Sequence, residues 1–105
     1  MKMVVTKVKL KPGSTESCAQ LFRETNPDLV RDQPDWLGAC MMVDQDNDMV
    51  TVMASWRDAT SYEALAKSEA FQATMARFVG LFASPPEITV NDVVVEMTPE
   101  NIVND

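Results

Sequence analysis

Two aromatic side chains six residues apart are the best candidates for chemistry in this sequence. Trp56 ends an alternating apolar segment that begins at Met49, and Tyr62 lies in the helical pattern that follows a short polar turn. A ring at a strand end and a ring at the start of the next helix can both face the space between a sheet and its covering helix. There they could pack against an aromatic ligand while the indole N–H and the phenol O–H bind its polar edge. Each also has a structural reading, Trp56 as plain core and Tyr62 as a ring whose hydroxyl reaches water.

Two further residues are expected to join these rings. Thr6 is a polar residue on an otherwise apolar strand face, which indicates a cavity lining, although its hydroxyl could also bond to nearby backbone. Met75 follows Tyr62 by thirteen residues, which places it near the same side of a helix at about 100° per residue. We therefore expect Thr6, Trp56, Tyr62 and Met75 to line one cavity between a sheet and the second helical region.

The hydrophobic pattern predicts six elements. Alternating segments indicate strands and segments with apolar residues three and four apart indicate helices. Pro27 is expected to end or kink the first helix, and Ser68 to break the second helical region. In chain order the expected elements are a strand at 4–10, a helix from 14 to about 27, a hairpin of strands at 36–43 and 49–56, a helical region at 60–82 and a strand at 88–97.

This βαββαβ order is that of the ferredoxin-like α+β sandwich, in which two helices cover one face of a four-stranded antiparallel sheet. The segment 36–43 is apolar on both of its faces, so the second face of the sheet also needs a cover. We expect a second copy of the chain to provide it, so that the homodimer is a dimeric α/β barrel. Residues 1–97 then form a single domain and residues 98–105 a polar C-terminal tail.

Composition excludes several classes of function. The net charge of −7 and the lack of a Lys/Arg cluster disfavour binding to nucleic acid or to an anionic membrane surface. The chain has no His, and its two cysteines, Cys18 and Cys40, stand alone, so no metal site is expected. Isolated cysteines and the charged start of the chain lead us to expect a cytoplasmic protein with reduced thiols.

Four short motifs occur in an order and at spacings that resemble the antibiotic biosynthesis monooxygenase family over about residues 3–97. The resemblance implies a dimeric α/β barrel and, for many members, oxygenation of polyketide phenols or quinols without metal or flavin. The motifs are Lys11-Pro12-Gly13, Pro34-Asp35-Trp36-Leu37-Gly38, Ser55-Trp56-Arg57-Asp58 and Ser68-Glu69-Ala70-Phe71.

The branches of that family differ in their site residues. Members that oxidise anthrones resemble this chain because they carry a Trp and a Tyr that match Trp56 and Tyr62. At the position of their Asn, however, this chain has Val52, and Arg77 lies only near the position of their helix Arg. Members that degrade haem carry an Asn and a His at positions where this chain has Thr6 and Met75. The resemblance therefore points away from haem degradation.

The resulting expectation is a cofactor-independent monooxygenase that acts on an electron-rich phenol or quinol with dioxygen. Without metal or flavin, the substrate itself must supply the electrons. Tyr62 and Arg77 would stabilise the phenolate and Trp56 would stack on the ring or donate to it. The proton acceptor stays open among a carboxylate, a water and the substrate's own second oxygen. The alternative is a non-catalytic dimeric barrel that binds a small hydrophobic metabolite. The residues expected to contact the substrate are Thr6, Val52 and Met75.

Overall fold

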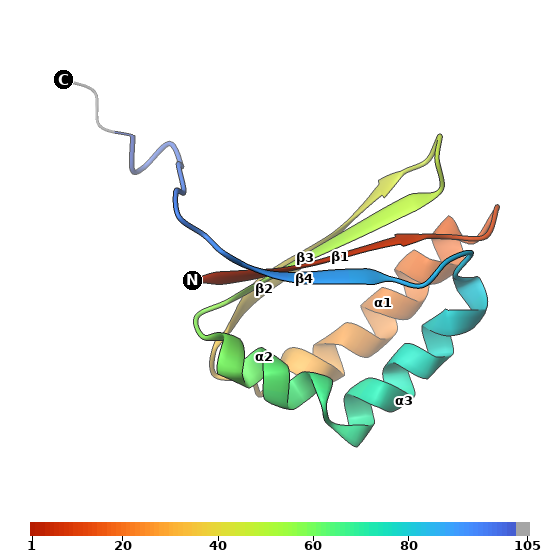
Figure 1. The fold of residues 1–105 in the computed structure, drawn as a ribbon, viewed down its shortest axis with the longest axis horizontal. Helices are drawn as coiled ribbons and strands as arrows, with labels where there is room; N and C mark the ends of the chain where they lie inside the picture. Colours follow the sequence, from red (N-terminus) through yellow and green to blue (C-terminus); the bar gives the residue numbers. More distant parts are fainter. Residues whose placement is uncertain (103–105) are drawn as a thin grey trace.

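A computed structural model describes residues 1–102 of the chain as a four-stranded antiparallel sheet with helices on one face (Figure 1). The strand order is β2-β3-β1-β4, and every neighbouring pair is antiparallel. This is the expected ferredoxin-like α+β sandwich. The elements are β1 (Lys2–Lys9), α1 (Thr15–Val30), β2 (Trp36–Asp44), β3 (Met49–Trp56), α2 (Ala59–Ala66), α3 (Glu69–Phe78), the short 3₁₀ helix η1 (Val79–Leu81) and β4 (Glu87–Asp92).

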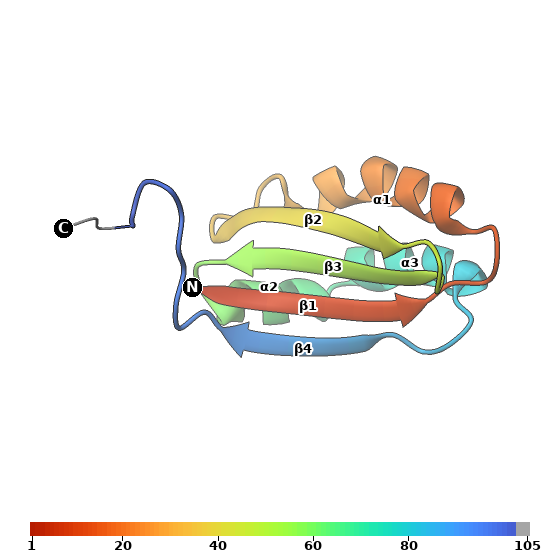
Figure 2. The same cartoon turned by 90° about the horizontal axis from the view of Figure 1, so that it is seen from above.

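Helices α1, α2 and α3 all lie on the same side of the sheet, and the opposite side carries no helix (Figures 1 and 2). Two clusters of buried side chains fill the space between the layers. One is centred on Leu10 and Val50, and the other on Val4 and Trp56. Because side chains alternate along a strand, the even-numbered residues of β1 and β3 face the helices and the odd-numbered residues face away.

The sequence predicted that Pro27 would end or kink the first helix. In the structure α1 continues past Pro27 to Val30. Proline removes one backbone hydrogen bond, yet the last turn is closed by the Arg31 N–H, which donates to the Pro27 carbonyl at 2.9 Å. Val30 is 5% exposed and packs in the cluster around Trp56. Burial of this last turn offsets the cost of the proline.

The last strand is shorter than predicted and ends at Asp92 instead of residue 97. Its partner β1 begins at Lys2, which pairs with Asp92, so no strand remains for later residues to pair with. The final contact is the Val93 N–H, which donates to the Met1 carbonyl at 3.1 Å. Residues 93–102 then lead away from the domain (Figure 1), and Val94 is 86% exposed. The predicted polar tail lies partly in 103–105, outside the described residues.

The second helical region is divided near Ser68, as predicted. Ser68 accepts the Phe71 N–H at 3.1 Å through its hydroxyl, which caps α3. Asp58 caps α2 in the same way by accepting the Thr60 N–H at 2.8 Å. None of the helices in residues 1–102 has the length and apolar character that a membrane crossing requires.

Candidate functional site

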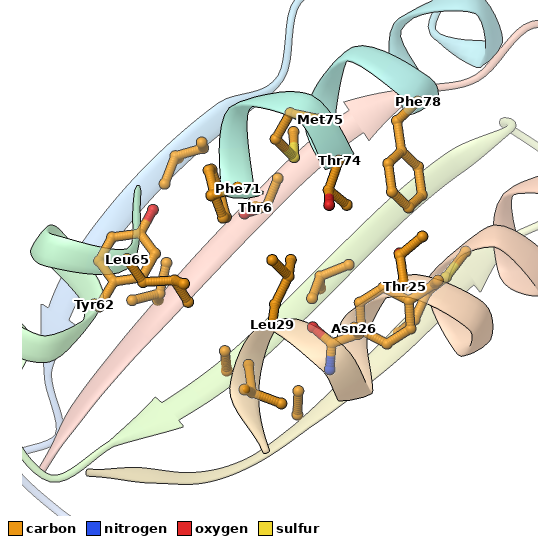
Figure 3. Close-up of a pocket in the computed structure, with 18 of the residues that line it drawn as sticks. Thr6, Thr25, Asn26, Leu29, Tyr62, Leu65, Phe71, Thr74, Met75 and Phe78 are labelled. Atoms are coloured by element: carbon orange, nitrogen blue, oxygen red, sulfur yellow. The ribbon is translucent and has the colours of Figure 1, made fainter. Parts of the chain in front are cut away.

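A cavity of about 140 Å³ lies between the sheet and helices α1 and α3 (Figure 3). An apolar cavity of about 150 Å³ can hold one benzene ring, so this one matches a single aromatic ring. Ile88 on the edge strand β4 both lines the cavity and is 44% exposed, which places an opening to solvent beside that strand. A larger ligand can therefore extend outward past β4.

Strands β1 and β3 form the floor of this cavity. Thr6 and Val52 are partners across the two strands, and Trp56 follows on the same face at the end of β3. All three line the cavity, as the strand register predicted for Thr6 and Trp56. Trp56 is 2% exposed and therefore buried.

Helices α1, α2 and α3 together form the roof. Tyr62 in α2 stands over Trp56 with ring centroids 5.9 Å apart and planes tilted by 59°, a favourable aromatic geometry. Met75 points down from α3 beside Thr74 (Figure 3). Thr6, Trp56, Tyr62 and Met75 thus line one cavity, although Tyr62 and Met75 belong to two separate helices and not to one axis.

Arg77 does not join these residues. It lies exposed in the last turn of α3 and is not among the cavity-lining residues. The neighbouring Phe78 is buried and faces the cavity instead, because successive residues of a helix point about 100° apart. The sequence placed Arg77 only near the family's Arg position, and the structure gives it no contact with the site.

Four polar cavity residues were missed by the sequence analysis. Thr25 and Asn26 line the cavity from α1, Thr74 from α3 and Trp36 from the start of β2. Asn26 lies inside the helix expected to reach about residue 27 but was not identified as a site residue, although with Phe22 and Leu29 it follows the spacing of one helix face, and that signal could have found it.

Trp36 reaches the cavity because of a β-bulge. The pairing shifts between Trp36 and Gly38, so Trp36 pairs with Trp56 while Ala39 pairs with Ala54. An even-numbered and an odd-numbered residue of β2 therefore face the same side. Gly38 has a φ of 152°, which a residue with a side chain rarely adopts, so the bulge depends on glycine here.

A hydrogen-bond cluster at Asp35 holds the aromatic end of the cavity together. The Ser61 hydroxyl donates to the Asp35 carboxylate at 2.6 Å, and the Arg57 guanidinium lies 3.5 Å from the same carboxylate. The Arg57 backbone N–H also donates to the Asp35 carbonyl at 2.7 Å. These three residues are the chain neighbours of the three large amphipathic rings of the cavity, namely Trp36, Trp56 and Tyr62. Asp35 therefore ties β2, β3 and α2 together where the rings meet.

The cavity holds almost no ionisable groups. Among residues 1–102, the lining includes no carboxylate, lysine or arginine, and the only titratable side chains are Tyr62 and Cys18. Burial raises the pKa of the Tyr62 phenol and also that of the Cys18 thiol. Tyr62 therefore stays protonated near neutral pH and can act as a hydrogen-bond donor. The residues that line the cavity are Val4, Thr6, Val8, Cys18, Phe22, Thr25, Asn26, Leu29, Val30, Trp36, Ala39, Met41, Val50, Val52, Ala54, Trp56, Tyr62, Leu65, Phe71, Thr74, Met75, Phe78, Phe82 and Ile88.

Solved structures of other proteins share this fold. An antibiotic biosynthesis monooxygenase is 20% identical and superposes with a TM-score of 0.74 over 90% of this chain and 100% of its own. A protein from Mycobacterium tuberculosis is 13% identical, with a TM-score of 0.75 over 92% of this chain and 98% of its own. A variant of SnoaB, a cofactor-independent oxygenase from Streptomyces nogalater, is 15% identical, with a TM-score of 0.77 over 93% of this chain and 96% of its own. At these identities the likeness shows the fold alone.

Sequence comparison assigns the family. No curated protein matches the chain in sequence. The sequence profile described as antibiotic biosynthesis monooxygenase matches residues 1–77, which include β1 to β3, α2 and most of α3. The matched span therefore contains Thr6, Trp56, Tyr62 and Met75, and the chain belongs to the antibiotic biosynthesis monooxygenase family.

Proposed function

We propose that this chain is a cofactor-independent monooxygenase that acts on an electron-rich phenol or quinol. The observation that carries the proposal is the composition of the cavity, in which an apolar space of single-ring size is bordered by neutral donors. An aromatic ring is matched by the apolar walls, and a phenolate oxygen by the N–H and O–H groups. The name of SnoaB as a cofactor-independent oxygenase supports the same reaction class for this fold.

The reaction requires no external reductant if the substrate supplies all four electrons. A phenol with a free para position and one dioxygen give a para-quinone and one water, so one oxygen atom enters the product and the other leaves as water. The phenolate is the form that gives up an electron readily, and its charge needs stabilisation inside the cavity. Tyr62 donates a hydrogen bond to that oxygen, Trp56 stacks on the ring or donates to it, and Thr6, Val52 and Met75 contact the rest of the substrate. Arg77 has no place in this arrangement, because it does not line the cavity.

No carboxylate lines the cavity, so the base is a water or an oxygen of the substrate. A quinol monoanion fits this requirement, since one of its oxygens has already lost its proton in water. The substrate can also enter as the phenolate already formed in water, which favours phenols of low pKa and higher pH.

Oxygen consumption with 1-naphthol tests the proposal. This phenol should give 1,4-naphthoquinone with one dioxygen consumed per product, faster than autoxidation. Tyr62→Phe should lower the rate about a hundredfold, because one donor to the developing oxyanion is lost. Glu63→Gln is the matched control, since Glu63 is the exposed neighbour on the same helix and should leave the rate unchanged. Equal rates with protein, with Tyr62→Phe and without protein would refute the proposal.

The second candidate function is a non-catalytic barrel that binds a small hydrophobic metabolite. The lack of any charged side chain in the cavity favours it, because binding needs no base. Saturable binding of 1-naphthol without oxygen consumption would support this second function over the first.

We also propose that the chain works as a homodimer, formed by the sheet face that carries no helix. The residues on this face are those that alternate with the cavity floor, and they include Val5, Cys40, Met42 and Met53. Met42 is 44% exposed. The face is mixed, because Lys7 and Thr51 lie on it as well. A stable interface buries more than about 1,000 Å² in total, and the apolar part of this face is the surface that a second copy would cover.

Light scattering of the wild type and of Met53→Asp tests the dimer. The wild type should have twice the mass of the chain at micromolar concentration. Met53→Asp should give a folded monomer, because the new carboxylate would be buried in the interface. A wild-type monomer would contradict the proposal, and so would a dimer that Met53→Asp leaves intact.

A further inference from the structure

Two buried hydrogen-bond donors of the cavity have no acceptor. Among the described residues, nothing accepts from the indole N–H of Trp36 or from that of Trp56, and both nitrogens are closed off from solvent. Buried donors in proteins are paired in the great majority of cases, and an unpaired one calls for a physical explanation. Two of them in one cavity suggest a missing common partner.

The two indoles are neighbours in space. Trp36 and Trp56 are backbone partners across β2 and β3, and the bulge at Gly38 turns both side chains to the cavity side. Directly opposed residues of antiparallel strands have Cβ atoms about 4.5–5.5 Å apart. Tyr62 adds a third ring against Trp56.

Neither indole N–H meets an acceptor in the present arrangement of the described residues. The side chains packed in this cluster are apolar, among them Val4, Val30, Leu29, Leu65 and Phe71. The Asp35 carboxylate, the nearest acceptor along the chain, is bonded to Ser61 and Arg57. Both indole N–H groups are therefore left for a ligand that has an acceptor, since the nearby Tyr62 hydroxyl accepts from neither of them.

We propose that Trp36 and Trp56 donate together to an oxygen of the ligand, a carbonyl or a phenolate attached to an aromatic ring. An oxygen of this kind has two lone pairs and can accept from both indoles. Each nitrogen is covered by neighbouring side chains, so the ligand oxygen reaches it after a side-chain rotation of the kind common on binding. Trp36 is then a specificity residue that selects ring compounds with an oxygen over hydrocarbons of the same shape. This inference rests on the proposed function only in assuming that the cavity binds an aromatic ring.

NMR of ¹⁵N-labelled protein tests the inference, because the chain has only two tryptophans and therefore two indole signals. Acetophenone, with one carbonyl acceptor and no donor, is compared with isopropylbenzene, which has nearly the same shape without the oxygen. Acetophenone should move both indole proton signals downfield, as expected for a new hydrogen bond, and isopropylbenzene should cause only ring-current shifts. Trp36→Phe keeps most of the ring and removes the donor. It should weaken acetophenone binding about tenfold and leave isopropylbenzene binding unchanged.

The outcomes separate this inference from the proposed function. Binding of both compounds with equal affinity and no downfield shift would overturn the role of the indoles while the aromatic cavity stands. Indole protons that are already downfield and slow to exchange before any ligand is added would show that a buried water satisfies them, which also overturns the inference. If neither compound binds, the aromatic cavity itself fails. Should Trp36→Phe not fold, the two titrations of the wild type still decide.

Discussion

Removing the hydrogen bond between Ser61 and Asp35 should lower the stability of the protein by an amount that the structure allows us to work out. The Ser61 hydroxyl is half-buried and lies 2.6 Å from the carboxylate, whose side chain is 28% exposed. Hydrogen bonds to a charged group contribute about 1.5–3 kcal/mol, and the partial exposure of Asp35 places this one at the lower end, about 1.5 kcal/mol. Ser61→Ala should therefore lower the free energy of unfolding by about 1.5 kcal/mol.

Urea denaturation followed by tryptophan fluorescence measures this loss, and a double-mutant cycle isolates the pair. Asp35→Ala should cost more than Ser61→Ala, because it also releases the Arg57 guanidinium. The double variant should cost less than the sum of the two single variants, by an interaction energy of about 1 kcal/mol. Asp28→Ala is the matched control, since the Asp28–Arg31 pair is exposed at 76% and 66% and should have no measurable effect on stability.

Two results would refute this reasoning. Strict additivity of Ser61→Ala and Asp35→Ala would show that the two side chains do not interact in solution. An Asp28→Ala loss as large as that of Ser61→Ala would show that the Asp35 cluster is no different from a surface ion pair.

Three further predictions concern single side chains. The Tyr62 phenol should titrate above the ordinary tyrosine pKa of about 10, and absorbance at 295 nm measures this directly because Tyr62 is the only tyrosine of the chain. Because folding raises this pKa, the contribution of Tyr62 to stability should be complete below about pH 10 and should be lost as the pH rises through the folded pKa. Titration at the ordinary tyrosine pKa would contradict this. Cys40 is exposed, whereas Cys18 is buried and its pKa is raised, so a thiol reagent should modify Cys40 quickly and Cys18 only on unfolding. If the open sheet face forms the dimer, the reaction of Cys40 should slow as the protein concentration rises. Ser68→Ala should lower the free energy of unfolding by about 1 kcal/mol in thermal or urea denaturation, because the cap of α3 is lost, whereas a neutral effect would mean that α3 does not depend on this cap.

The fold was predictable because its signals are local. The approximate alternation from Val4 to Leu10 and from Met49 to Trp56 defined both central strands, and the order of strands and helices then defined the topology. The ends of elements were less predictable. Pro27 is a helix breaker in isolation, but burial of Val30 outweighed it, and the end of β4 depends on where its partner β1 begins.

The site was predictable where side chains follow a strand register and was missed where the backbone departs from it. Thr6 and Trp56 share one face because both strands are regular. Trp36 reaches the same cavity only through the bulge at Gly38, which alternation cannot reveal. Arg77 was expected near the ligand from a family position, yet one residue along a helix turns a side chain by about 100°, and Phe78 faces the cavity in its place.

Whether the cavity is an oxygenase site is decided most directly by turnover of 1-naphthol under ¹⁸O₂ with mass analysis of the quinone. The wild-type protein should produce 1,4-naphthoquinone that carries one ¹⁸O atom, with the second ¹⁸O in water, and Tyr62→Phe should lose most of this product while Glu63→Gln retains it. Because quinone oxygens exchange with water, the product is reduced and trapped immediately, and added ¹⁸O-labelled quinone measures the residual exchange. Quinone without ¹⁸O after that correction, or labelled quinone formed equally by Tyr62→Phe, would contradict oxygen insertion in this cavity.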